Sequence, residues 1–299
     1  MPKKQEGQPT QRELDLAHTA ATIENEAPSS LAFLHSSLCQ VHMPRSRTDV
    51  RVFERTDGAV SLRMEAGATR IGDQWVEQPL PYGTKPRLIL LHLNSYATRH
   101  KTREIPVGKS LSEFMQSLGL APSGGPRGNY RSMRSHLVAL AVCRFQLHIQ
   151  HSPNSMSNRM SEPVESFDAW VTGRDTVWPG YMRLSHTYYE SLVEHSAPLD
   201  PRAIRALSSS SLELDIYSWL AHRLCRVRSQ GQFVPWQSMR AQFATKDTDH
   251  QSFKRWFLTA LNRVKRVYQH ARIESIKGGL VLRQSKPPIP RRVQLSLID

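Results

Sequence analysis

The same order of expected secondary-structure elements occurs twice along the chain, and this repetition restricts the possible folds more than any other feature. In the first copy, apolar residues at helical spacing begin near residue 84, and a short helix capped by Ser110 follows at 111–118. A third helix covers about 127–141, and two extended stretches follow at about 142–150 and 164–171. The first copy therefore reads as three helices and a β-hairpin.

The second copy has the same plan. Residues 212–227 place apolar side chains on one helical face, Pro235 introduces a short helix, and a long helix spans about 249–270. Two short β-type runs then flank Lys277-Gly278-Gly279, which is a hairpin signal. Three helices followed by a hairpin, with the third helix exposed, is the arrangement of a winged helix, whose recognition helix enters the major groove of DNA.

The positive charge of the chain is concentrated in these two copies. The chain carries a net charge of +14. Residues 85–134 hold nine basic and two acidic side chains, residues 251–299 hold eleven and two, and the remaining segments are close to neutral. Each third helix and its hairpin lie in or beside one of these basic islands. Two separate islands predict two modules that bind the phosphates of a polyanion.

These observations predict an α+β protein with two winged-helix domains. A flexible N-terminal tail is expected at 1–30, a first winged-helix domain at 31–175, a second at 176–290, and a C-terminal tail at 291–299. The longest apolar runs are far shorter than a membrane span, and the polar first ten residues do not resemble a secretion signal. Three widely spaced cysteines are typical of a reducing cytoplasm. The expected location is therefore the cytoplasm.

A β-hairpin is expected before the first copy. Residues 48–52 and 60–64 alternate apolar and polar side chains around Asp57-Gly58, and residues 66–83 read as a loop. The apolar face of this hairpin, with Val50 and Val52, must pack on something, because an isolated two-stranded ribbon is marginally stable. It packs on its own domain or pairs with a second copy of the chain, so a homodimer is possible.

Candidate DNA-binding residues are the cations and amides that face outward on the basic segments. The alternative for each cation is a solvated helix face, and for the asparagines it is capping or solvent exposure. The aromatic residues Phe253, Trp256 and Phe257 are expected in the core. The candidates are Lys101, Arg103, Arg127, Asn129, Arg131, Arg134, Lys254, Arg255, Asn262, Arg263, Lys265, Arg266 and Lys277.

Motifs for other chemistry are weak. Thirteen histidines form no HxH or HExxH motif and no cluster with cysteine, so no metal site is expected. Tyr188 and Tyr189, beside His186, raise the possibility of a strand-nicking tyrosine, but no paired-histidine site or arginine clamp accompanies them. No phosphate-binding G-x-x-x-x-G-K-[ST] motif is present. The sequence therefore predicts neither a cofactor nor an enzymatic activity.

Eight blocks of the sequence together resemble the RepA-type plasmid replication initiators. They occur in order over roughly residues 30–290, with Arg45 where histidine is expected and Ala244 where glycine is expected. The blocks are LCQVHMPR at 38–45, PYGTKPRL at 81–88, KTREIPVGKSLSEFM at 101–115, PLD at 198–200, LDIYSWL at 214–220, PW at 235–236, QF at 242–243 and GLVLR at 279–283.

This resemblance implies sequence-specific binding to double-stranded repeats at a plasmid origin and opening of the strands. It also implies recruitment of the host replication initiator and helicase, and a balance between a self-associating form that represses and a monomer that initiates. Two other functions stay open on the residues alone. The first is a plasmid-encoded transcriptional repressor that uses the same DNA contacts, and the second is a strand-nicking initiator enzyme.

Overall fold

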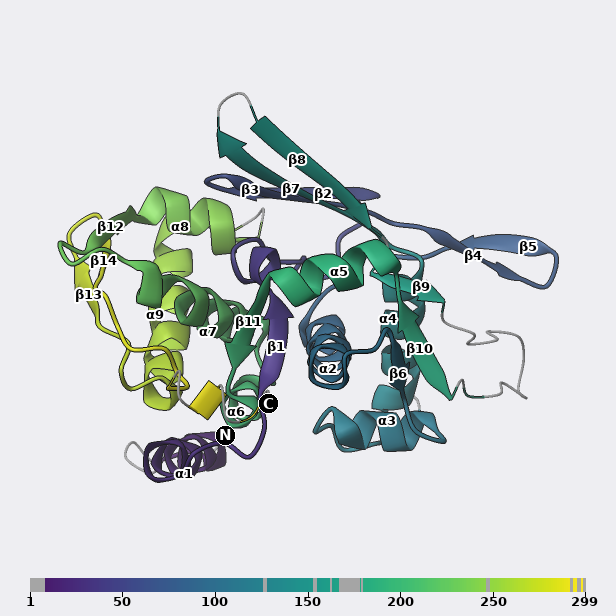
Figure 1. Ribbon diagram of the computed structural model, residues 1–299, viewed down its shortest axis with the longest axis horizontal. Coiled ribbons are helices and arrows are strands. Elements are labelled where there is room, and N and C mark those ends of the chain that lie inside the picture. The colour runs from purple at the N-terminus through teal and green to yellow at the C-terminus, as the bar shows by residue number, and fades with distance from the viewer. Residues whose placement is uncertain are drawn as a thin grey trace, which may run out of the picture.

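The computed structural model describes residues 9–125, 128–152, 155–161, 163–166, 178, 180–245, 248–290, 293–294 and 297. The fold is mixed α+β, with helices packed around several small antiparallel sheets (Figure 1). The helices are α1 (Gln11–Asn25), α2 (Thr84–His100), α3 (Leu111–Ser117), α4 (Asn129–Ala141), α5 (His186–Glu194), α6 (Pro201–Leu207), α7 (Ser211–Arg223), α8 (Trp236–Phe243) and α9 (His250–Val267).

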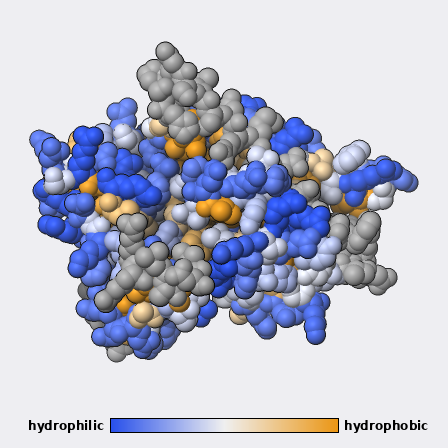
Figure 2. Space-filling view, in the orientation of Figure 1, coloured by the Kyte–Doolittle hydropathy of each residue, from blue (hydrophilic) through white to orange (hydrophobic). Residues whose placement is uncertain are grey.

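The strands are β1 (Ala32–His35), β2 (Val52–Asp57), β3 (Val60–Glu65), β4 (Ala68–Ile71), β5 (Gln74–Glu77), β6 (Glu104–Pro106), β7 (Arg144–Ser152), β8 (Ser155–Ser161), β9 (Val164–Ser166), β10 (Tyr181–Leu184), β11 (Ser196–Leu199), β12 (Gln232–Pro235), β13 (Ile273–Ile276) and β14 (Gly279–Leu282). Figure 2 shows that the face seen in Figure 1 is mostly hydrophilic, with small hydrophobic patches.

Two units of the chain share one topology. The first unit runs α2, β6, α3, α4, β9 and β10, and its sheet has the strand order β6-β10-β9. The second unit runs α7, β12, α8, α9, β13 and β14, and its sheet has the order β12-β14-β13. In both sheets the strand that follows the first helix pairs with the last strand. The repeated order of elements expected from the sequence is therefore present, with β7 and β8 inserted into the first unit.

The first hairpin differs from its expected position. The stretches 142–150 and 164–171 were expected to pair with each other as a hairpin. Instead, β7 pairs with β3 on one side, with Phe145 opposite Met64, and with β8 on the other. Strand β8 lies in the segment between the two stretches. Alternating apolar side chains on both β3 and β7 explain this pairing, because it buries them on one face. The hairpin of the first unit is instead β9–β10. Residues 167–171 lie outside the described residues.

The N-terminal hairpin is present around Asp57-Gly58 as expected, but its first strand, β2, spans 52–57 and not 48–52, and its faces are divided differently. Phe53 is opposite Met64 and Arg55 is opposite Leu62, so these β2 residues share the inner face with buried β3 side chains. Val52 lies on the outer face and is 40% exposed, contrary to the expectation that it belongs to the apolar face. Because side chains alternate along a strand, this register also sends Arg55 inward.

The segment 66–83, expected as a loop, contains the hairpin β4–β5, which projects from the body as an arm (Figure 1). Trp75 on this arm is 72% exposed. Both ends of the arm are held by Arg51, whose guanidinium donates to the carbonyl oxygens of Ala66, Gly67 and Gln78. By donating to carbonyl oxygens at both ends of the arm, this one side chain stabilises the position where the arm leaves the body.

The segment expected as a flexible N-terminal tail contains a packed helix. Helix α1 begins with a capping box in which Thr10 and Glu13 satisfy each other's backbone N–H groups, and it packs on α6 and α9. In the expected C-terminal tail, Val293 and Leu297 pack against buried Phe33 and Ile289. Residues 1–8 lie outside the described part of the chain.

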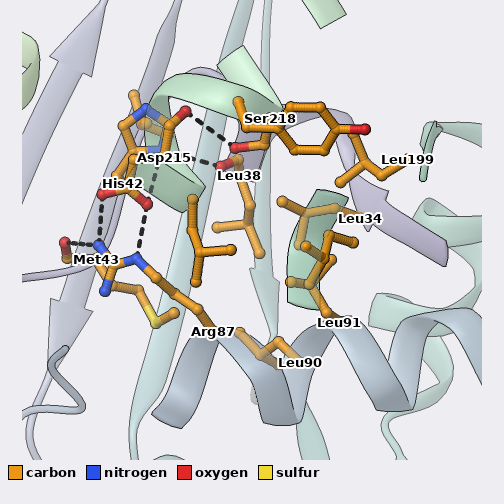
Figure 3. Close-up of a pocket in the computed structure, with 14 residues that line it drawn as sticks. Leu34, Leu38, His42, Met43, Arg87, Leu90, Leu91, Leu199, Asp215 and Ser218 are labelled. Carbon is orange, nitrogen blue, oxygen red and sulfur yellow. Dashed lines mark hydrogen bonds and ion pairs between the residues drawn. The ribbon is translucent and has the colours of Figure 1, made fainter. Parts of the chain in front are cut away.

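The two units meet at the centre of the molecule. Strand β1 pairs antiparallel with β11, with Ala32 opposite Leu199, and β1 also packs on α2. The first helices of the units, α2 and α7, are joined by a buried ion pair between Arg87 and Asp215, with His42 beside it (Figure 3). The two hydrogen bonds from Arg87 to the carboxylate measure 2.6 and 2.8 Å.

Arg87 uses its remaining donors on the backbone. Its guanidinium also donates to the carbonyl oxygens of Met43, Pro44 and Gly83, so every N–H group of the side chain has an acceptor. Burial alone would raise the pKa of Asp215, but the charge and hydrogen bonds of Arg87 lower it below its usual value, while burial lowers the pKa of His42 to about 4. The carboxylate is therefore charged at neutral pH. Next to the pair, a mostly apolar cavity of about 30 Å³ is large enough for about one water and too small for a ligand.

The substitution Arg87→Ala is expected to lower the free energy of unfolding by about 3–5 kcal/mol, because it leaves the Asp215 carboxylate buried and without its cation. Equilibrium urea denaturation measures this loss. Arg283→Ala is the matched control, since Arg283 pairs with Glu274 at the surface, and its denaturation midpoint should stay close to that of the parent. Equal effects of the two substitutions would contradict a structural role for the buried pair.

Candidate nucleic-acid interface

Helix α9 is built to present a basic face to solvent. Asp249 caps its N-terminus by accepting hydrogen bonds from the backbone N–H groups of Gln251 and Ser252. Phe253 and Phe257 are fully buried and pack against each other with ring centroids 5.6 Å apart. Because apolar residues recur every three or four positions, one side of the helix is buried and the other remains free for a ligand.

The free side of α9 carries several of the expected DNA-binding residues. Arg255, Asn262 and Arg266 are exposed, while Lys254 and Lys265 are half-buried. The ammonium of Lys254 lies 5.4 Å from the centre of the Trp236 ring, which orients it at the junction of α8 and α9. Arg255 and Asn262 are separated by about 10 Å along the helix, at 1.5 Å per residue.

Arg263 has a structural contact that its position in the sequence did not reveal. Its guanidinium lies 3.1 Å from the carboxylate of Glu213, which is 2% exposed and also pairs with Arg12 at 2.5 Å. Glu213 therefore joins α7 to α9 and to α1. A buried carboxylate needs cations, so Arg263 is less available for DNA than Arg255.

Trp256 does not lie in the core, contrary to the expectation for the three aromatic residues of α9. Its side chain is 51% exposed, whereas Phe253 and Phe257 are buried. At about 100° per residue, Trp256 falls about 60° to one side of Phe253, and Phe257 falls on the other side. Helix α9 packs on α7, and Phe257 lies on the buried face of α9. Trp256 therefore remains at the edge of this face.

The hairpin β13–β14 places Lys277 at an exposed tip, followed by Gly278 at a φ of +91°. Gly279 is required by close packing, because a Cβ atom there would lie 2.2 Å from the carbonyl oxygen of Val234 on β12. Across the hairpin, Arg283 pairs with Glu274 at 3.0 Å. The turn therefore has a defined shape and presents a cation at its end.

In the first unit, α4 presents Arg131 and Arg134 to solvent while Met133 and Leu137 are buried. The two arginines border a surface hollow together with Tyr130 and the start of α3, including Ser110. No acidic residue lines this hollow among the described residues. The arrangement places two cations on the third helix, as the sequence predicted.

Other candidates of the first unit have structural contacts or lie elsewhere. Asn129 accepts a hydrogen bond from the Ser123 N–H group and donates to the carbonyl oxygen of Ala121, so its amide holds the loop before α4. Arg103 donates to the carbonyl oxygen of Leu184, joining β6 to β10. Lys101 is exposed in a left-handed conformation at the end of α2. Arg127 lies outside the described residues.

Four arginines that were not among the candidate DNA-binding residues border a groove between β2 and α8, together with Arg63. Arg45 and Arg47 precede β2, Arg55 lies on it, and Arg240 lies on α8. The distribution of charge along the sequence did not predict this site, because residues 1–84 carry a slight net negative charge and residues 151–250 are nearly neutral. Only the packing of β2 beside α8 brings these four cations together.

Of the two tyrosines considered for strand nicking, Tyr188 is inaccessible and Tyr189 is half-buried. Tyr188 is buried, its hydroxyl exchanges hydrogen bonds with Asn94, and burial raises its pKa, so it is shielded from a phosphodiester. Within the described ranges, no group of three His, Cys, Asp or Glu side chains is placed to hold a metal ion. Among the same residues, no helix combines the length and apolar character that crossing a bilayer requires.

Comparisons with known proteins place the chain in a family. No match was found among curated protein sequences. A crystal structure of selenomethionine derivatives of domains 2 and 3 of RctB covers 84% of this chain and 99% of its own, at 14% identity and a TM-score of 0.49. A second structure of RctB domains 2–3 covers 82% and 94%, at 14% identity and a TM-score of 0.47. The family model described as plasmid encoded RepA protein matches residues 80–238, more than half of the chain, and the protein therefore belongs to the RepA family.

Proposed function

We propose that this protein is a plasmid replication initiator that binds double-stranded repeats at the origin through two winged-helix domains. One observation carries the proposal: each of the two units presents a basic third helix, α4 or α9, beside a hairpin in a sheet of the same strand order. Membership of the plasmid RepA family supports replication as the process in which this binding occurs. The proposed domains are residues 31–175 and 176–290.

The dimensions of α9 suit a recognition helix. The major groove is about 12 Å wide, so Arg255 and Asn262, about 10 Å apart along the helix, can face base edges together. Arg266 lies about 16 Å from Arg255 and is better placed for a phosphate at the rim of the groove. Arg131 and Arg134 are proposed for the same tasks on α4, and Lys277 for a backbone contact from the wing.

The proposal assigns no chemical reaction to the chain. Opening of the origin would be driven by binding energy and by host proteins, for which the family resemblance suggests the host initiator and helicase. The burial of Tyr188 argues against a strand-nicking tyrosine at that position. A transcriptional repressor is the second candidate, because the same outward cations serve both functions.

Binding to a duplex that carries the plasmid's own repeats should be steeply salt-dependent, with a log–log slope of about −5 to −9 for six to ten phosphate contacts. Arg131→Ala or Arg255→Ala should cost about 1–3 kcal/mol and relax the preference at a defined base pair, whereas Lys277→Ala should weaken all sequences alike. Fluorescence anisotropy over a salt series measures the slope and the binding free energy of each variant. Arg70→Ala on the β4–β5 arm is the control, and equal losses on cognate and random DNA would indicate shape readout instead.

A plasmid that carries only this gene and its upstream repeats should replicate in a host that lacks any other initiator for it. Transformation efficiency and copy number measure this, and the double variant Arg131→Ala, Arg255→Ala should abolish maintenance. A repressor would silence a reporter placed behind the repeats without supporting replication. Nicked circles formed by purified protein from supercoiled DNA would point to the enzyme instead.

Self-association stays a prediction, and the structure indicates which residue can test it. Arg51 is unsuitable for substitution, because it holds the arm at Ala66, Gly67 and Gln78. Val52 is exposed on β2, an outer strand of the sheet β2-β3-β7-β8, and Val52→Lys should leave the domain folded. If β2 is the dimer edge, analytical ultracentrifugation should show a folded monomer where the parent dimerises. A variant that still dimerises would exclude this edge.

A further inference from the structure

The groove between β2 and α8 is lined by five arginines and one carboxylate, and the charge of buried Asp215 also reaches Arg45 and Arg55. Arg45, Arg47, Arg55 and Arg240 have no ion pair within 4.0 Å in the part of the chain that the structure describes. The carboxylate of the lining, Glu54, is engaged by Arg63 at 2.6 Å. The groove is therefore strongly positive, although it lies outside both basic islands of the sequence.

Two of these arginines, Arg45 and Arg55, are half-buried. Arg55 lies 5.1 Å from the centre of the Phe53 ring and donates to the carbonyl oxygen of Ala244 at 3.0 Å, and burial lowers its pKa to about 10. Burial also lowers the pKa of Arg45, whose buried Nε atom has no hydrogen-bond partner among the described residues. Both remain charged at neutral pH. Burying unpaired cations costs free energy, which a bound anion would offset.

The other two arginines, Arg47 and Arg240, are exposed to solvent. Arg47 is exposed at the mouth of the groove and makes no hydrogen bond or ion pair with described residues. Arg240 is also exposed, although its guanidinium donates to the carbonyl oxygen of Thr248. Planar guanidinium groups match the oxygens of a phosphate, and four of them line this groove, from the segment before β2, from β2 and from α8.

We propose that this groove binds phosphate groups of the DNA backbone. The inference rests on the proposed function and adds to it a third contact surface, which belongs to neither recognition helix. Its position supports DNA as the source of the phosphate, because α8 directly precedes and packs on α9. A duplex seated on α9 thus passes close to α8, and the arginines of β2 face α8 across the groove.

The test measures the salt dependence of binding of the full chain to a random-sequence 30-base-pair duplex. Arg47→Gln should reduce the magnitude of the log–log slope by about 0.9, the value for one lost phosphate contact. Arg70→Gln removes the same charge from the exposed β4–β5 arm and should leave the slope unchanged. Arg45→Gln is the second groove variant, with circular dichroism to confirm that it folds. Slopes equal to that of the parent for Arg47→Gln and folded Arg45→Gln would overturn the proposal.

A second measurement separates DNA from a free phosphate compound. NMR of the ¹⁵N-labelled arginine side chains should show the Arg45 and Arg55 Nε signals shifting when the duplex is added. If inorganic pyrophosphate shifts them saturably and the duplex does not, the groove binds a small phosphate ligand and its assignment to DNA is wrong. If the parent binds no duplex at all, the proposed function fails, and the pyrophosphate titration alone decides whether the groove is an anion site.

Discussion

The buried ion pair between Arg87 and Asp215 is the contact on which the relation between the two units depends. It joins their first helices, α2 and α7, and Arg87 also satisfies three backbone carbonyls of the segments that lead into α2. Such a pair is not an efficient source of stability, since desolvation opposes the Coulomb attraction. Its directionality, with five hydrogen bonds from one side chain, instead favours one arrangement of the two helices.

Strands β2 and β3 before the first unit, and β7 and β8 inserted into it, form a second contact between the two units. The sheet β2-β3-β7-β8 combines strands from before and within the first unit, and its outer strand β2 contacts the second unit. Asp57 at the end of β2 accepts a hydrogen bond from Gln242 at 2.9 Å and lies 3.5 Å from Arg223. The first unit is therefore bound to α7 and α8 at both its core and its rim, which limits how the two basic helices can move relative to each other.

Basic side chains in this protein serve two different purposes, and net charge does not distinguish them. Arg263 and Arg103 belong to the basic islands but hold Glu213 and the β6–β10 junction. Arg45 and Arg55 belong to a segment without excess charge, yet they line a groove in which arginines outnumber carboxylates. The difference arises from neighbours distant in sequence, because a cation that forms an ion pair with a buried carboxylate, as Arg263 does, is less available to a ligand than a cation without an ion pair.

The sequence by itself determined the helices of the two units and their order, because helical periodicity and caps such as Ser110 act over a few residues, and it located hairpin turns such as Asp57-Gly58 for the same reason. It also identified the outward cations Arg131 and Arg255, whose positions follow from the buried faces of their own helices. Only the tertiary structure decided that β7 pairs with β3, that Trp256 remains exposed and that Arg55 faces α8. These outcomes depend on contacts between segments far apart in the chain, and local periodicity carries no information about which buried surfaces meet.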